Sequence, residues 1–264
     1  MTSMGNYIII SFVALIGLII GSFLNVAIHR VPTKTMFKNN RSECPNCHSQ
    51  LKWYHNIPLL SYLFLAGKCS FCKKKISFRY PLVELLNSIF YGLLFWKFSF
   101  TTEFAVFALI ISSLIVIFFI DLDHQIIPDV ITLPGIIVGL AVSMFPDGIG
   151  IINALIGFLV GGGALYLVAI LGDFLFKKDS MGGGDIKMAA MLGAFLGWQK
   201  VLLIFMLSSV IGLVISIAIM TVSEKLRKER LIPFGPFIAI AAVIAISYGD
   251  QIIYFYQQNF LYNN

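Results

Sequence analysis

Residues 104–120 read FAVFALIISSLIVIFFI, a run of seventeen residues without a charged side chain, and Asp121 follows directly. A helix that crosses a membrane needs about 20 mostly apolar residues, because each residue adds about 1.5 Å and the hydrocarbon core is about 30 Å thick. This stretch is therefore predicted to be a transmembrane helix that ends at an aspartate.

The rest of the chain has the same apolar character. Hydrophobic residues occupy 58% of the 264 positions and charged residues 12%, whereas soluble domains have roughly 45–50% and 25%. Reading outward gives eight apolar runs, with seven or nine as alternatives because one run is short and contains glycine. The runs are 7–28, 82–98, 104–120, 126–145, 151–176, 186–198, 201–222 and 231–248. We expect an all-α, polytopic membrane protein. The first run is expected to be permanent, because residues 1–7 lack the Lys or Arg of a signal peptide.

The basic residues indicate the orientation of these helices. Of the nineteen Lys and Arg residues, ten lie in 29–80, three in 177–187 and four in 223–231. With eight spans these segments all fall on one side, together with 121–125. Positively charged loops are retained in the cytoplasm, so we expect these segments to be cytoplasmic and both termini to lie outside. The net charge of +6 then reflects topology and not nucleic-acid binding.

Residues 29–80 form the only sizeable segment outside the predicted spans. We therefore divide the chain into a first transmembrane helix (1–28), a small cytoplasmic subdomain (29–80) and a transmembrane core (81–264). The tail 250–264 is polar and aromatic, and it has no predicted role.

All four cysteines lie in this subdomain, as two C-x2-C pairs separated by 21 residues: Cys44, Cys47, Cys69 and Cys72. Two such pairs can bind Zn²⁺ tetrahedrally through four thiolates, and neighbouring lysines favour the thiolate form. Two disulfides are the alternative, but structural disulfides are rare in the cytosol. We predict a closed, structural zinc site, with His48 as a surface residue.

Acidic residues gather in two clusters beside the apolar runs. Charged groups at membrane depth are costly, so they are candidate functional residues. The first cluster, DLDHQIIPD at 121–129, begins with Asp121 and ends with Asp129. The second, MGGGDIK at 181–187, contains Asp185 after three glycines. Glycines permit positive φ and the close approach of another chain. A helix N-cap is the alternative role for Asp185.

Two carboxylates at one membrane face favour general acid–base chemistry. One activates a water molecule while the other protonates the carbonyl or the leaving group, and repulsion between like charges leaves the pair with one shared proton. No Ser–His or Cys–His pattern competes, and the chain has no H-E-x-x-H motif. The residues alone do not decide between Asp121 and Asp123 as the partner of Asp185.

In their order and spacing, these features resemble the bacterial type IV prepilin peptidases (prepilin leader peptidases), a family of membrane-embedded aspartic proteases. The matching motifs run through most of the chain. They are GSFLNVAIHR at 21–30, the two cysteine pairs, RYPLVELL at 79–86, the 121–129 cluster, G-x-G-D-x-K at 182–187 and IPFGPF at 232–237.

The resemblance implies that Asp121 and Asp185 are the catalytic pair. It also implies supporting roles for four nearby residues: Gly182, Gly184, Lys187 and Asp129. The expected activity is removal of a short basic leader from type IV prepilins or pseudopilins at the cytoplasmic face of the bacterial inner membrane. Glycine flexibility at 182–184 is expected to let the substrate strand reach the carboxylates.

Family members with the cysteine-bearing loop also methylate the new N-terminal amine, with S-adenosylmethionine as the donor. This activity is therefore expected here as well. The chain has no glycine-rich cofactor loop of the soluble methyltransferase kind. Asn25 and Glu84 are candidates for the cofactor site by position only, and hydrogen bonding between helices is an equal alternative for both.

Two other classes of function compete with a peptidase. A transporter or ion channel would use Asp121, Asp185 and Glu84 as proton or cation ligands. The acids are expected at one face and not along a path through the midplane, which argues against this class. A zinc-containing scaffold that recruits a cytoplasmic partner would leave both aspartate clusters unexplained.

Overall fold

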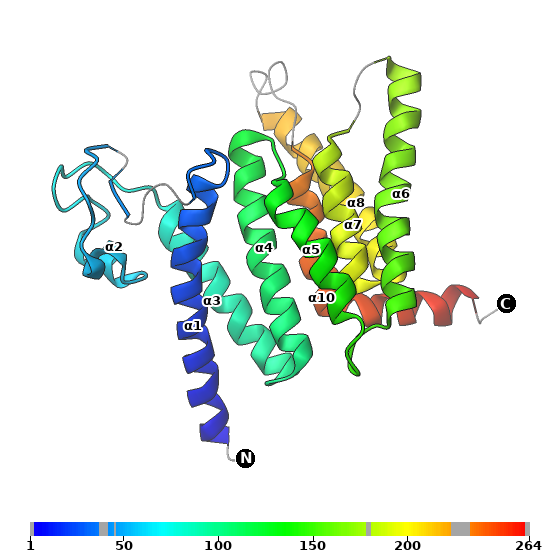
Figure 1. The fold of residues 1–264 in the computed structure, drawn as a ribbon, viewed down its shortest axis with the longest axis horizontal. Helices are drawn as coiled ribbons and strands as arrows, with labels where there is room; N and C mark the ends of the chain where they lie inside the picture. The colour runs from blue at the N-terminus through cyan, green and yellow to red at the C-terminus, as the bar shows by residue number, and fades with distance from the viewer. Residues whose placement is uncertain (1–2, 37–41, 45, 178–180, 223–232, 262–264) are drawn as a thin grey trace. The chain divides into compact units, whose positions relative to one another are not determined.

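A computed structural model of the chain describes residues 3–36, 42–44, 46–177, 181–222 and 233–261. Within these residues the fold is helical, with two isolated bridges and no strand. Eight helices match the eight predicted runs (Figure 1): α1 (Ser3–Arg30), α3 (Arg79–Phe98), α4 (Thr102–His124), α5 (Asp129–Val142), α6 (Ile151–Phe176), α7 (Gly183–Leu196), α8 (Trp198–Val222) and α10 (Gly235–Tyr256). The predicted all-α class is confirmed. The basic segment 223–231 lies outside the described residues.

Five of these helices are long and apolar enough to cross a membrane: α1, α4, α6, α8 and α10. The chain is therefore a multi-pass membrane protein. At 14 residues each, α5 and α7 are shorter, about 21 Å against a hydrocarbon core of about 30 Å. α5 is shorter than its predicted run 126–145 because Pro128 is its N-cap and the chain turns from Ser143 onward.

The helices belong to two compact units, Met1–Ile120 and Asp121–Asn264. In the first unit, α1 and α3 approach closely through Gly17 and Gly21. A Cβ atom would lie 2.8 Å from the Ser88 Cα at position 17 and 2.7 Å from the Glu84 Cα at position 21. This small-xxx-small spacing lets two backbones pack together inside a membrane.

Buried hydrogen bonds reinforce this packing. The Asn87 amide donates to the Gly17 carbonyl at 2.8 Å, and the Ser88 hydroxyl donates to the Ala14 carbonyl at 2.8 Å. Ser112 of α4 donates to the Asn87 side-chain oxygen at 3.1 Å. Polar groups at membrane depth are satisfied in this way between helices. They also explain why α3 is less uniformly apolar than its neighbours.

The second unit is built around α7. All nine residues from Met188 to Leu196 are buried, and α5, α6, α8 and α10 pack around this helix. Small residues allow these contacts: Gly157 of α6 meets the backbone of Gly193, and a Cβ atom on Gly139 of α5 would lie 3.1 Å from the Ala194 Cβ. Because other helices cover α7, a length of 14 residues is sufficient for it.

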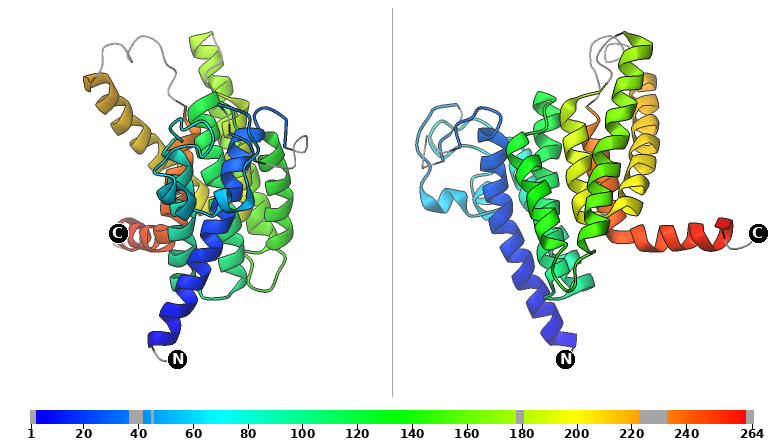
Figure 2. Two further views of the ribbon diagram at one scale, coloured as in Figure 1. Left: turned by 90° about the vertical axis from the view of Figure 1, so that its left-hand side faces the viewer. Right: turned by 45° about the vertical axis from the view of Figure 1, so that its right-hand side comes forward.

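The last helix continues beyond the predicted boundary at residue 248. α10 ends at Tyr256, and a π-helical turn, η2 (Gln257–Leu261), follows. Figures 1 and 2 show the red C-terminal part of α10 running across the direction of α6 and α8. Lys200 at the start of α8 pairs with Asp250 at 2.9 Å. This ion pair fixes the start of the tail, which had no role in the sequence analysis.

Candidate active site and metal centre

Asp121 lies in the last turn of α4, where its side chain is only 5% exposed. Its Oδ2 atom accepts a hydrogen bond of 3.1 Å from the backbone N–H of Gly235, the first residue of α10. Helix N-termini favour anions, because their first N–H groups are unpaired and the helix dipole is positive there. A Cβ atom at position 235 would lie 2.6 Å from this same oxygen. The contact therefore requires glycine.

Asp185 lies in the first turn of α7. Its Oδ1 atom is buried and has no hydrogen-bond partner among the described residues. Leaving a buried polar oxygen unbonded is unfavourable, so such an atom calls for a bound water or a catalytic role. The N-cap position belongs to Gly182, and the capping alternative for Asp185 therefore finds no support. The free oxygen is available to a water molecule or a substrate.

Ile127 packs against two glycines: Gly184, which precedes Asp185, and Gly235, whose N–H binds Asp121. A Cβ atom on Gly184 would lie 2.7 Å from the Ile127 Cβ, and one on Gly235 would lie 3.1 Å from the Ile127 Cδ1. The segment between α4 and α5 is thus packed against the N-termini of both α7 and α10. In this arrangement the carboxylates of Asp121 and Asp185 are near enough to interact electrostatically.

Two sequence expectations are refined here. None of the glycines at 182–184 has a positive φ, and Gly182 is extended at φ −69° and ψ 135°. The positive φ that glycine permits is not used here, and the close contact with Ile127 is what requires a glycine at position 184. Asp123 is exposed whereas Asp121 is buried. Asp121 is also the aspartate that interacts electrostatically with Asp185.

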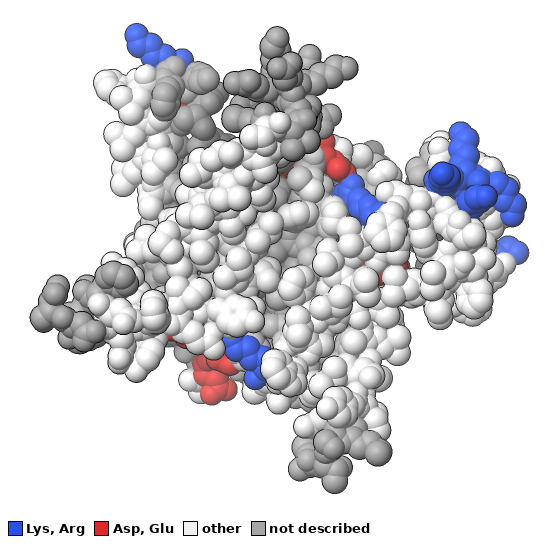
Figure 3. Space-filling model, turned by 180° about the vertical axis from the view of Figure 1, so that it is seen from behind, with Lys and Arg blue, Asp and Glu red and all other residues white. Residues whose placement is uncertain are grey.

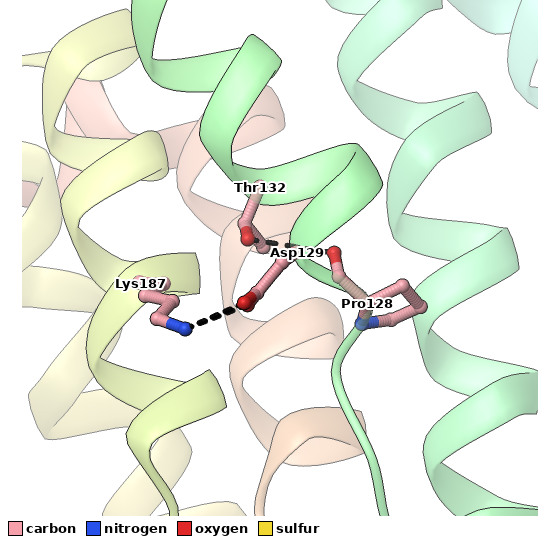
Figure 4. Close-up of polar contacts among 4 residues, drawn as sticks. All are labelled: Pro128, Asp129, Thr132 and Lys187. Atoms are coloured by element: carbon pink, nitrogen blue, oxygen red, sulfur yellow. Dashed lines mark hydrogen bonds and ion pairs between the residues drawn. The ribbon is translucent and has the colours of Figure 1, made fainter. Parts of the chain in front are cut away.

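Figure 4 shows a second contact between the two acidic motifs. Lys187 Nζ lies 2.8 Å from both carboxylate oxygens of Asp129. Asp129 is the first residue of α5, after the N-cap Pro128, and Thr132 donates to the Pro128 carbonyl at 3.4 Å. The ion pair is half-exposed, with side-chain exposures of 41% and 54%. It ties the start of α5 to α7.

The four cysteines form a compact cluster. Their sulfur atoms all lie within 4.8 Å of one another, and the Sγ atoms of Cys44 and Cys72 are 3.9 Å apart. A tetrahedral zinc site with Zn–S bonds of about 2.3 Å places sulfur atoms about 3.8 Å apart. None of the four is in a disulfide. The donor set and its spacing fit Zn²⁺.

The two cysteine pairs adopt the same turn. In each pair the N–H of the first cysteine donates to the carbonyl five residues later, and its carbonyl accepts from the N–H four residues later. The residue after the second cysteine has a positive φ in both turns: 53° at His48 and 59° at Lys73. His48 is exposed, as predicted, and serves the turn. Equivalent loops present two sulfurs each, as expected for a metal site.

The thiols differ in acidity. Hydrogen bonds with the side chain and backbone of Ser49 lower the pKa of Cys47 to about 6. Backbone hydrogen bonds from Cys72 and Phe71 lower the pKa of Cys69. At Cys72 a backbone hydrogen bond from Lys74 lowers the pKa, but burial and the other thiols raise it to about 11. Without a cation the four thiols therefore do not all ionise readily, because neighbouring thiolate charges repel one another. A divalent cation would offset that repulsion.

Asn25 and Glu84, the positional candidates for a cofactor site, both bind backbone groups of the first unit. Asn25 donates to the Tyr80 carbonyl at 3.0 Å. Glu84 is 8% exposed and accepts from the Leu59 N–H at 2.9 Å. These bonds account for both residues structurally, so we assign neither of them to S-adenosylmethionine.

A multi-pass helical protein with two neighbouring carboxylates at helix ends has the features of a membrane aspartic protease. Comparison with known families is consistent with this class. Residues 108–217 match the type IV leader peptidase family, and residues 15–98 match the bacterial peptidase A24 N-terminal domain. The chain belongs to the type IV leader peptidase family.

Several curated relatives share the description prepilin leader peptidase/N-methyltransferase. Proteins so named from Stutzerimonas stutzeri and Pseudomonas aeruginosa are each 39% identical to this chain, over 92% of both sequences. One from Neisseria gonorrhoeae is 34% identical over 90% of both. No solved structure matches the chain.

Proposed function

We propose that the chain is a membrane aspartic endopeptidase that removes the leader peptide from type IV prepilins or pseudopilins. The observation that carries the proposal is the neighbouring pair of Asp121, hydrogen-bonded to a helix N-terminus, and Asp185, which has a buried and unpaired oxygen. A transporter would need acids along a membrane path, and nothing in the fold or among the relatives favours one.

Each carboxylate has a role in the proposed hydrolysis. Asp121 accepts an N–H bond as an anion does, and it acts as the base that takes a proton from water. The water oxygen forms a bond with the scissile carbonyl carbon, while protonated Asp185 donates its proton to the carbonyl oxygen. As the C–N bond breaks, the leaving nitrogen takes the proton held by Asp121, and a hydroxyl group of the tetrahedral intermediate returns its proton to Asp185, which restores the starting pair. Cleavage thus needs no metal or cofactor.

The supporting residues position this pair. Gly184 and Gly235 permit the close packing of Ile127, and the Lys187–Asp129 ion pair joins α5 to α7. The two aspartates lie at ends of apolar helices, and this position suits a substrate that is cut just before its own hydrophobic helix. On the distribution of basic residues, we propose that the site faces the cytoplasm of a bacterial inner membrane and that both termini lie outside.

We also propose that the enzyme methylates the new N-terminal amine. The relatives' shared description and the intact N-terminal domain support this second activity. S-adenosylmethionine would supply the methyl group. The cysteine cluster is proposed to hold a structural Zn²⁺ through Cys44, Cys47, Cys69 and Cys72.

A membrane cleavage assay tests the peptidase. Wild type should shorten a prepilin-like precursor, and Asp121→Asn and Asp185→Asn should not, although both variants insert and accumulate normally. Asp123→Asn is the matched control, because Asp123 lies on the same helical turn but is exposed, and it should retain cleavage. If wild type inserts correctly but cuts no precursor, the peptidase proposal fails and proton or ion flux becomes the measurement to make.

A further inference from the structure

The segment between α1 and α3, residues 31–78, contains the four cysteines and is called the cysteine loop below. It contacts α1 at Ser22, more than one helical turn before the end of that helix. Ser22 Oγ lies 3.5 Å from the Asn56 carbonyl, a long hydrogen bond. The apolar run of α1 ends at Ile28, six residues after Ser22, which corresponds to about 9 Å along a helix. The part of the loop around Asn56 therefore lies beside the apolar part of α1.

The contact with α3 also lies inside an apolar run. The Leu59 N–H donates to the buried Glu84 carboxylate at 2.9 Å, and Glu84 lies two residues inside the apolar run 82–98, or about 3 Å along the helix. Leu59 has φ 57°, a region that leucine rarely adopts. A strained backbone held on a buried carboxylate indicates a fixed position and not a chance contact.

The segment at this depth exposes large apolar side chains. The short helix α2 (Leu60–Phe64) begins directly after Leu59, and Figures 1 and 2 show it beside α1. Leu63 is 71% exposed and Phe64 83%. Trp53, in the preceding 3-10 turn η1 (Trp53–Asn56), is 80% exposed. In water such a surface would be unfavourable, whereas beside acyl chains it is not.

The opposite edge of the loop is basic. Figure 3 shows Lys and Arg side chains gathered on one edge of the cysteine loop, with uncharged atoms below them. The basic residues of the second cysteine turn, Lys68 and residues 73–75, are all exposed. Clusters of lysines near a membrane surface are attracted to anionic headgroups. The loop is therefore amphipathic, as expected for an element that lies in a membrane interface.

We propose that the cysteine loop is inserted into the membrane leaflet beside α1 and does not stand free in water. The α2 side chains contact lipid acyl chains, and the lysine edge faces the headgroups. The hydrogen bonds to Ser22 and Glu84 set the depth. This inference goes beyond the proposed peptidase and does not depend on which side of the membrane the loop occupies.

Depth-dependent fluorescence quenching tests the insertion. The three native tryptophans are replaced by phenylalanine, and a single tryptophan is introduced as Phe64→Trp or, as a matched control on the basic edge, Lys74→Trp. The full-length protein is placed in phosphatidylethanolamine–phosphatidylglycerol vesicles with brominated acyl chains. The tryptophan at position 64 should lose fluorescence to brominated lipid and resist aqueous iodide, and the one at position 74 should behave in the opposite way.

Unchanged zinc content and precursor cleavage show that each variant is intact. If the Phe64→Trp protein fails either check, Leu63→Trp is measured in the same background. Quenching of the α2 tryptophan by iodide and not by brominated lipid means that the loop stands in water, which overturns the proposal. Quenching by neither means that protein covers α2, most simply a second copy of the chain, and this also overturns it.

Discussion

Lys187 Nζ donates to both carboxylate oxygens of Asp129 at 2.8 Å, across 58 residues of sequence. Lys187 follows Asp185 by two positions on α7, and Asp129 begins the helix that comes after the Asp121 segment. One ion pair thus joins the two segments that carry the proposed catalytic carboxylates. Its role is expected to be positional, because its half-exposed charges contribute little to stability.

Replacing Lys187 with methionine should therefore reduce cleavage more than stability. Small displacements of reacting groups lower rates by roughly ten- to a hundredfold, whereas loss of a surface ion pair costs less than about 1 kcal/mol. Cleavage rates on a prepilin-like precursor, compared with thermal unfolding in detergent, separate the two effects.

Two variants control this experiment. Lys200→Met breaks a Lys–Asp pair that involves neither α5 nor α7, and it should leave cleavage close to wild type. The charge swap Lys187→Asp with Asp129→Lys should recover part of the lost rate. A full rate in Lys187→Met would remove the ion pair from the active-site architecture.

Gly235→Ala should abolish cleavage without preventing membrane insertion. The added methyl group would lie 2.6 Å from Asp121 Oδ2 and 3.1 Å from Ile127 Cδ1, so the carboxylate must move away from the N–H that binds it. Gly183→Ala is the matched control, because a Cβ atom there meets nothing within 4 Å. Equal activity of the two alanine variants would contradict the proposed geometry.

Much of the fold was predictable from local pattern. The helices follow from apolar runs whose lengths match a bilayer, as with residues 104–120. The metal cluster follows from the spacing of the cysteines, since Cys44 and Cys69 begin two equivalent turns. The aspartate motifs also pointed to the residues that the fold brings together.

What the sequence did not predict depends on contacts between distant segments. Ile127 is an ordinary apolar residue in a loop, and only the packing of α7 and α10 around it brings it against both Gly184 and Gly235. The bond between Asp121 and Gly235 spans 114 residues. The spacing of Gly17 and Gly21 was readable as a helix-packing motif, but it was overshadowed by the apolar run around it.

Loss of two sulfur ligands should empty the metal site. Cys44→Ser with Cys69→Ser removes one ligand from each turn, and the remaining thiols cannot complete a tetrahedral site. Zinc measured by atomic spectroscopy in the purified protein should fall to background, whereas His48→Ala should retain it because His48 is exposed. Unchanged zinc in the double serine variant would exclude the four-cysteine assignment.

Acidification should also release the metal from the wild-type protein. Zinc binds thiolates, and protons compete for the same sulfur atoms, so occupancy falls as the pH is lowered. The metal raises the acidity of its ligands beyond that of the free cluster, in which the pKa of Cys47 is already about 6. Zinc release followed with a chromophoric chelator should therefore begin below neutral pH. Release that is independent of pH would argue against thiolate ligands.

The close approach of α1 and α3 should be sensitive to a single methyl group. A Cβ atom on Gly17 would lie 2.8 Å from the Ser88 Cα, which is backbone and cannot rotate away, so Gly17→Ala should destabilise the first unit by about 1–3 kcal/mol. Gly92→Ala adds the same group to the same interface with contacts of 3.8 and 4.0 Å, and the better helix propensity of alanine should make it neutral or mildly stabilising. Zinc release on heating in detergent reports on this unit, because the cysteine loop connects α1 to α3. Zinc release at the same temperature in both variants would contradict this prediction, because it would show that a methyl group at position 17 does not destabilise the first unit.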